Sequence, residues 1–119
     1  MSEVTTHHDG HGLNESIVIV ASEPGPGGAS HFYDFMIEGK RVAMLQFQEG
    51  PRNVEGSIPG VTTSAVIAAL IDHLSGFQSG GLANAETSKA IKHLEMAMAQ
   101  MKNRADNRAQ RGVLGTMNK

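Results

Sequence analysis

The sequence predicts an α+β fold: an N-terminal antiparallel β-sheet followed by a C-terminal two-helix hairpin, with several copies associated. Three observations carry this prediction. Short β-branched and aromatic segments, separated by glycine and proline, fill residues 15–60. Two segments with apolar residues at helical spacing follow in residues 61–116. The second of these is much longer than the first, so its end has no partner within one hairpin.

Residues 1–14 are expected to form a flexible tail, because they are polar and show no hydrophobic periodicity. The histidines in this segment could bind a metal, but with no ordered element to hold the ligands, a tail is the preferred interpretation. Residues 15–119 are expected to form a single domain. Its strands are predicted at Ser16–Ala21, His31–Ile37 and Val42–Gln48, with a further short one over Asn53–Ile58.

The helical part begins at Thr62, a suitable N-cap, and its first helix is predicted to run to Ser75. A glycine-rich turn through Ala83 leads to Asn84, the expected N-cap of a second helix that reaches about Arg111. At about 1.5 Å per residue, the two helices are about 21 Å and about 40 Å long, so roughly the last ten residues of the second have no partner within the hairpin.

The long helix carries an apolar seam whose members alternate at spacings of three and four, as on a helix-packing face: Ile91, Leu94, Met98, Met101 and Ala105. Aromatic residues make up only 4% of the chain and Trp is absent, so the core of one copy is expected to be thin. A seam that continues beyond the hairpin therefore predicts self-association.

Basic residues concentrate at the end of the long helix, where Arg104, Arg108 and Arg111 follow at spacings of four and three. The formal net charge of −2 argues against a nucleic acid polymer as partner, which would need a broad basic field. A local basic cluster in a nearly neutral protein fits a small anion. The alternative is a solvated helix end whose cations compensate the helix dipole.

Nothing in the chain resembles a catalytic set, and no enzyme activity, cofactor or metal is expected. His73 and His93 have no Ser or Cys partner in a recognisable pattern, and the chain has no Cys at all. No apolar segment approaches the roughly 18 residues that a membrane span needs, so no membrane partner is expected.

The hairpin region resembles the helical domain of phage anti-defence sponge proteins, which include anti-CBASS and Thoeris anti-defence members. The matching segments are Val61-Thr62, Gly76-Phe77-Gln78-Ser79-Gly80, Glu86, Leu94-Glu95, Arg104 with Arg108, and Arg111-Gly112-Val113 followed by Gly115-Thr116. The β-rich part, with Phe47-Gln48-Glu49-Gly50-Pro51, looks like the Thoeris anti-defence branch.

The resemblance implies roles for four residues. Phe77 would stack on an adenine, Arg104 and Arg108 would bind phosphates, and Thr87 stands at a ligand-contacting position where the family commonly has Asn. Thr keeps a hydroxyl but lacks the amide. Where the family commonly has Gly-Pro-Phe, this chain has Gly80-Gly81-Leu82.

The resemblance also implies a function. The expected protein is a homo-oligomer, a dimer or hexamer, in the cytoplasm of the host bacterium. It would sequester glycocyclic ADP-ribose (gcADPR) and also cyclic di- or trinucleotides without degrading them. An enzyme that cleaves such signals and a structural adaptor are the two alternatives.

Overall fold

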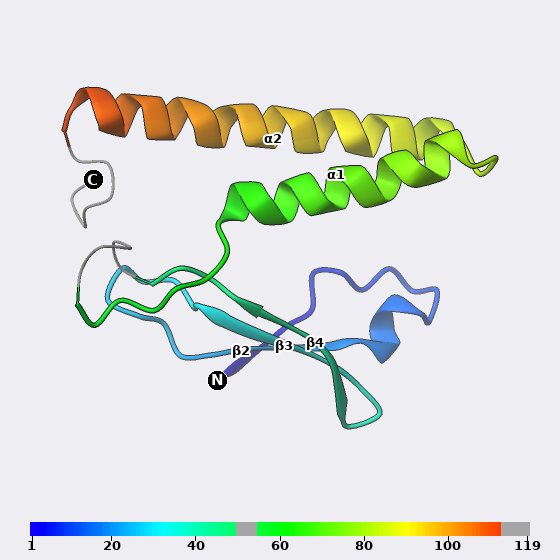
Figure 1. The fold of residues 1–119 in the computed structure, drawn as a ribbon. Helices are drawn as coiled ribbons and strands as arrows, with labels where there is room; N and C mark the ends of the chain where they lie inside the picture. Colours follow the sequence, from blue (N-terminus) through cyan, green and yellow to red (C-terminus); the bar gives the residue numbers. More distant parts are fainter. Residues whose placement is uncertain (50–54, 113–119) are drawn as a thin grey trace. The chain divides into compact units, whose positions relative to one another are not determined.

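The structure, a computed structural model, describes residues 1–49 and 55–112. The chain separates into two compact units, Met1–Val61 and Thr62–Lys119. A four-stranded antiparallel sheet forms the first, and two helices form the second (Figure 1). The predicted α+β order of sheet and helices is thereby confirmed, while the association of copies stays a prediction.

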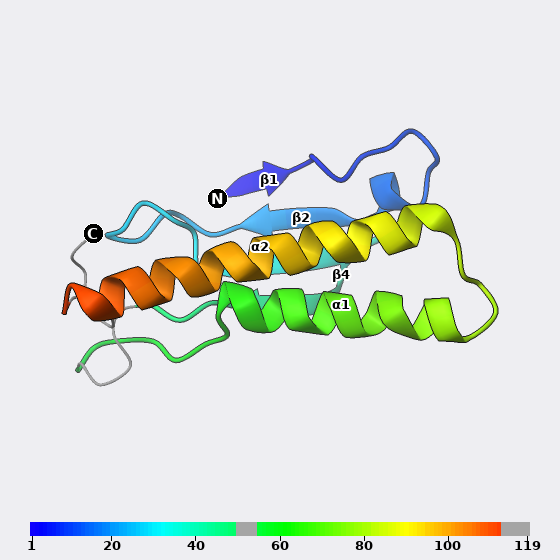
Figure 2. The ribbon, with the colours of Figure 1, turned by 90° about the horizontal axis from the view of Figure 1, so that it is seen from above.

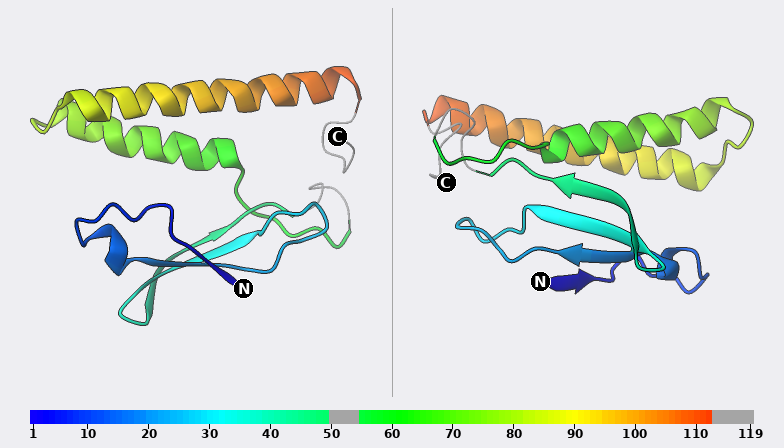
Figure 3. Two further views of the ribbon diagram at one scale, coloured as in Figure 1. Left: turned by 180° about the vertical axis from the view of Figure 1, so that it is seen from behind. Right: turned by 60° about the horizontal axis from the view of Figure 1, so that its bottom comes forward.

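The sheet has the strand order β1-β2-β3-β4, so each strand pairs with its neighbour in sequence (Figure 3). Its strands are β1 (Ser2–Val4), β2 (Val18–Ala21), β3 (Phe32–Ile37) and β4 (Lys40–Gln46). Residues 2–4 lie in the expected flexible tail, and this part of it is ordered instead, because β1 pairs with β2.

The hairpin between β3 and β4 turns on Glu38 and Gly39. Both residues have a positive φ, 49° and 76°, which is the conformation that a two-residue type I′ turn requires. Beyond β4, the chain returns and Ile58 forms a single antiparallel bridge with Glu49 in place of the expected strand over 53–58. Residues 53 and 54 of that expected strand lie outside the described residues.

The loop before β2 is organised around one carboxylate, that of Glu15 in the short helix η1 (Asn14–Ser16). Its oxygens accept hydrogen bonds from the backbone N–H groups of Asp9, Gly10 and Gly12, at 2.6, 2.9 and 2.7 Å. These bonds, above all those from Gly10 and Gly12, stabilise the charged form and lower the pKa of Glu15 to about 2.

The helical unit consists of α1 (Thr63–Ser79) and α2 (Ala85–Gln110), which pack side by side as a hairpin (Figure 2). Both predicted N-caps are confirmed: the Thr62 hydroxyl accepts from the Ala65 N–H at 3.1 Å, and the Asn84 side chain accepts from the Thr87 N–H at 2.7 Å. Since α2 has 26 residues and α1 has 17, the end of α2 runs past the start of α1.

The end predicted for the first helix is wrong by four residues. The glycine at 76 suggested a break after Ser75, but α1 continues to Ser79 and the connecting loop starts at Gly80. A glycine inside a helix costs only about 1 kcal/mol relative to alanine. Packing of the last turn against α2 offsets that cost, and Leu74 and Gln78 are both half-buried.

The core is thin, as expected. Among the described residues, only Ala21 and Ile67 are buried apolar side chains. One of them belongs to each unit, and several methionines remain exposed.

Candidate ligand-binding site

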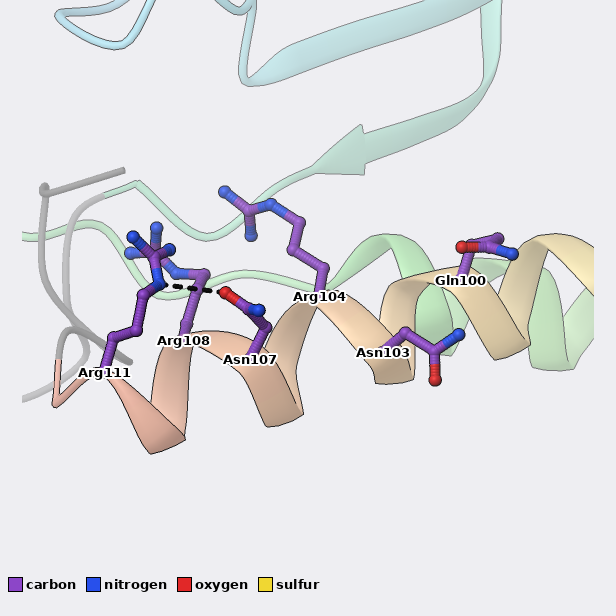
Figure 4. Close-up of a pocket in the computed structure, with 6 residues that line it drawn as sticks. All are labelled: Gln100, Asn103, Arg104, Asn107, Arg108 and Arg111. Atoms are coloured by element: carbon purple, nitrogen blue, oxygen red, sulfur yellow. Dashed lines mark hydrogen bonds between the residues drawn. The ribbon is translucent and has the colours of Figure 1, made fainter.

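The end of α2 carries a hollow of about 560 Å³ (Figure 4). Six described residues line it, all of them polar: Gln100, Asn103, Arg104, Asn107, Arg108 and Arg111. Five of them belong to α2 and Arg111 is its C-cap, and their spacings of three and four place them on one side of the helix. At 100° per residue, the three arginines lie within about 60° of one another around the helix axis. The arginine cluster expected from the sequence therefore forms one surface.

Little nearby negative charge neutralises this surface. Residues 100–112 contain four cationic side chains and one carboxylate, Asp106. Asp106 accepts a hydrogen bond from Lys102 at 2.8 Å, and this ion pair lies on the side of α2 opposite the arginines. The one acid at this end of α2 thus pairs with Lys102 and does not face the hollow.

Two of the arginines are held in place. Arg108 is only 7% exposed, and burial lowers the effective dielectric around its guanidinium, which strengthens any attraction to an anion. The Arg111 Nε donates to the Asn107 Oδ1 at 2.9 Å, the dashed contact in Figure 4. Arg104 makes no hydrogen bond or ion pair with any residue that the structure describes, which leaves its planar donor group available.

Phe77 lies in the last turn of α1 and not in the turn between the helices, where the sequence placed it. Its side chain is 42% exposed, so it does not belong to the core. One helical turn earlier on the same helix is His73, whose ring centroid lies 5.0 Å from that of Phe77 at an interplanar angle of 83°. Phe77 therefore presents an aromatic surface to solvent beside a second ring.

The loop after Phe77 is closed by the amide of Gln78. Its Nε2 donates to the Asn84 carbonyl and its Oε1 accepts from the Asn84 N–H, both at 3.1 Å. Asn84 in turn caps α2 at Thr87, which is half-buried in the first turn. This chain of hydrogen bonds fixes Phe77 and Thr87 at one end of the hairpin.

The four predicted site residues thus fall into two pairs. Phe77 and Thr87 lie at the loop end, whereas Arg104 and Arg108 lie at the far end of α2. Thr87 and Arg108 are 21 positions apart on one straight helix, or roughly 30 Å at 1.5 Å per residue. Within one chain, a single small cyclic nucleotide cannot touch both pairs.

The sequence reasoning missed the amide residues of the hollow and His73. Gln100, Asn103 and Asn107 follow the same three-and-four spacing as the arginines, so a helical projection of residues 100–111 would have identified them. His73 stands four residues before Phe77, a helical contact spacing that also signals an aromatic pair.

A second concavity, of about 740 Å³, follows the two helices on a different side of α2 from the arginines. We call it the apolar groove, and its lining consists of Ser64, Ile71, Glu95, Met98, Ala99, Met101, Lys102 and Ala105. It contains the seam residues Met98, Met101 and Ala105 that the sequence predicted to lack a partner.

Other kinds of site receive no support in the described part of the chain. No group of three His, Cys, Asp or Glu residues there could hold a metal ion. No helix among residues 1–49 and 55–112 is long and apolar enough to cross a membrane. Most of the terminal motif Arg111–Thr116 that the resemblance used lies outside the described residues.

Comparison with known proteins finds a similar phage protein. The chain is similar to "Thoeris anti-defense 1" of Bacillus phage SBSphiJ7, with 35% identity over 95 residues. The match covers 80% of this chain and 66% of the phage protein, so the chain spans just under two thirds of that relative. No protein-family model matches the chain. The similarity supports the Thoeris anti-defence branch of the resemblance and does not bear on the anti-CBASS branch.

Proposed function

We propose that this protein is a phage Thoeris anti-defence protein that binds and sequesters cyclic nucleotide immune signals in the host cytoplasm without degrading them. The ligands proposed are gcADPR and cyclic di- or trinucleotides. The named relative supports the anti-defence role, and the chemistry of the helical hairpin supports the ligand class.

The observation that carries the proposal is the arginine-lined hollow at the end of α2. Its volume falls within the range of roughly 300–1,000 Å³ that small-molecule sites occupy. Arginine binds phosphate oxygens through two parallel N–H groups, and side-chain amides can pair with ribose hydroxyls or base edges. Because Asp106 is paired on the opposite side of the helix, an incoming phosphate meets no nearby carboxylate on α2.

The loop end of the hairpin offers a surface for the base of the ligand. Phe77 lies in the last turn of α1, and its ring is exposed. An exposed aromatic ring can stack on a base, which contributes about 1–3 kcal/mol. Thr87, one helix further on, supplies a hydroxyl at the same end.

Because the two pairs of residues lie too far apart for one ligand, we propose two kinds of pocket in a homo-oligomer, a dimer or hexamer. The apolar groove is the surface proposed to bind a second copy. Glu95 and Lys102 flank Met98 in it, so an antiparallel arrangement places Glu95 of each copy level with Lys102 of the other. The arginine-lined hollow lies on a different side of α2 from this groove.

Sequestration is tested by identifying the compound that the protein releases when it is denatured. Purified protein is incubated with gcADPR, filtered to remove unbound ligand, denatured, and the released compound identified by mass spectrometry. Recovery of intact gcADPR at stoichiometric amounts is the expected result. A converted product would instead indicate an enzyme, and an absence of uptake would indicate an adaptor. Protein denatured before incubation is the control for nonspecific retention.

A further inference from the structure

One side of α1 carries a second, exposed stripe. Leu70, His73 and Phe77 follow at spacings of three and four, and all three are exposed. Along the same stretch of α1, the buried or half-buried residues are Ile67, Ile71, Leu74 and Gln78. The exposed stripe is thus not the face with which α1 packs in the hairpin.

His73 and Phe77 form a perpendicular ring pair on this stripe. The interplanar angle of 83° and the centroid distance of 5.0 Å match the edge-to-face arrangement that aromatic rings prefer. An exposed phenylalanine on a helix otherwise exchanges between two χ1 rotamers. Contact with the ring one turn earlier favours the rotamer in which the two rings touch.

The backbone on the other side of Phe77 is also fixed. Gln78 is the next residue, and its amide binds both the N–H and the carbonyl of Asn84. The direction of the Phe77 side chain is therefore set from two sides, by His73 before it and by the closed loop after it. A stacking surface arranged before the ligand arrives loses less entropy on binding.

We propose that His73 is a positioning residue of the base-stacking site: it holds the ring of Phe77 in the orientation that receives the base. This inference rests on the proposed function, because it concerns the same loop-end pocket. The feature required of His73 is its aromatic ring.

The first test measures gcADPR binding by calorimetry for the parent and three variants. His73→Gln removes the ring and is expected to weaken binding by about 2- to 10-fold, the loss for one side chain that must be ordered on binding. His73→Phe keeps a ring and should bind as the parent does. His93→Gln, a change of the same kind at an exposed histidine of α2, is the control and should change nothing.

The second measurement needs no ligand. Nuclear Overhauser contacts between the two rings and the χ1 average of Phe77 are compared in the parent and in His73→Gln. The parent should show one rotamer with ring contacts, and the variant an average of two. Helix content and melting temperature are recorded for both, so that a loss of fold is not mistaken for a loss of positioning.

The outcomes distinguish a failure of the positioning role of His73 from a failure of the proposed function. If the parent binds gcADPR while His73→Gln leaves both the affinity and the rotamer of Phe77 unchanged, the positioning role is refuted and the proposed function stands. If the parent itself takes up no gcADPR or other cyclic nucleotide, the proposed function fails and this inference fails with it.

Discussion

The amides of the α2 hollow distinguish it from an ordinary solvated helix end. Compensation of the helix dipole needs only positive charge in the last turn, which lysine supplies as well as arginine. Here three arginines share one side of the helix with Gln100, Asn103 and Asn107, and Asn107 orients Arg111. Planar donors combined with amides match the mixture of phosphate, ribose and base that a cyclic nucleotide presents.

Replacing Arg108 by Lys, or Arg104 by Lys, should weaken ligand binding although the net charge stays at −2. Lysine is a point charge and cannot form the two parallel bonds of a guanidinium. Loss of one charge-assisted hydrogen bond costs about 1.5–3 kcal/mol, or about tenfold or more in affinity. Calorimetry against a cyclic trinucleotide and against gcADPR measures the effect, and the trinucleotide is expected to depend on the arginines more strongly.

Arg41→Lys provides the matched control, because Arg41 lies in the sheet unit and pairs with Asp34 at 3.2 Å. Its affinity for both ligands should equal that of the parent. Should the two α2 variants also bind every ligand as tightly as the parent, the arginines would be a solvated helix end and the phosphate assignment would fail.

The sequence could indicate the arginines but not their setting. Spacings of four and three are enough to place Arg104, Arg108 and Arg111 on one side of a helix. The burial of Arg108, and the pairing of Asp106 with Lys102 on the other side, depend on side-chain rotamers, which a spacing does not encode. Amides on a helix are ordinary surface residues, so the amide residues of the hollow stand out only because they share the spacing of the arginines.

The connection between the two helices depends on one side chain. Gln78 makes two hydrogen bonds to the backbone of Asn84, so Gln78→Ala should destabilise the hairpin. A net contribution of about 0.5–1.5 kcal/mol per bond, in a solvent-exposed loop, leads to an expected loss of about 1–2 kcal/mol. Urea unfolding measures it. Gln100→Ala, a glutamine of α2 without such bonds to the described residues, is the control; equal stability of the two variants would contradict the role of the closed loop.

Glu15 gives the sheet unit a defined response to acid. Its pKa is lowered to about 2 in the folded chain, from 4.5, so folding favours the charged form. The stabilisation is fully present above pH 4.5 and is lost as the pH falls through about 2. The amide signals of Gly10 and Gly12 should therefore shift together near pH 2. In Glu15→Gln no such titration should occur, and a midpoint near 4.5 in the parent would show that the three backbone bonds are absent in solution.

The elements that the sequence located well are those with a strong local signal. Thr62 and Asn84 are N-caps as predicted, because an N-cap depends on chemistry within four residues. The strand Ser2–Val4 was missed, because so short a segment carries no periodicity. Its pairing partner β2 is distant in sequence, since Ser2 pairs with Ala21. Phe77 was predicted to lie in a turn because Gly76 has a low helix propensity. The packing of the last turn of α1 against α2, which offsets that cost, exists only in the folded hairpin.

Few apolar side chains are buried among the residues that the structure describes. Ala21 and Ile67 are the buried ones among the described residues, while Leu70, Met96 and Met101 are substantially exposed. A domain of about 120 residues usually needs a larger core to be stable alone. Burial of the apolar groove by a second copy would supply apolar contact that one chain lacks.

We therefore expect this protein to be an oligomer, and light scattering at micromolar concentration should give a mass of at least twice 12.6 kDa. Met101 lines the apolar groove and is 37% exposed, whereas Met96 is 64% exposed and lies outside the groove. Met101→Glu should lower the mass toward that of one chain, since burying a carboxylate in an interface costs several kcal/mol. Met96→Glu adds the same charge where no second copy is expected and should keep the parent's mass. A 12.6 kDa parent, or equal masses for the two variants, would show that the groove does not join copies. A 12.6 kDa parent would further require both kinds of pocket to exist within a single chain.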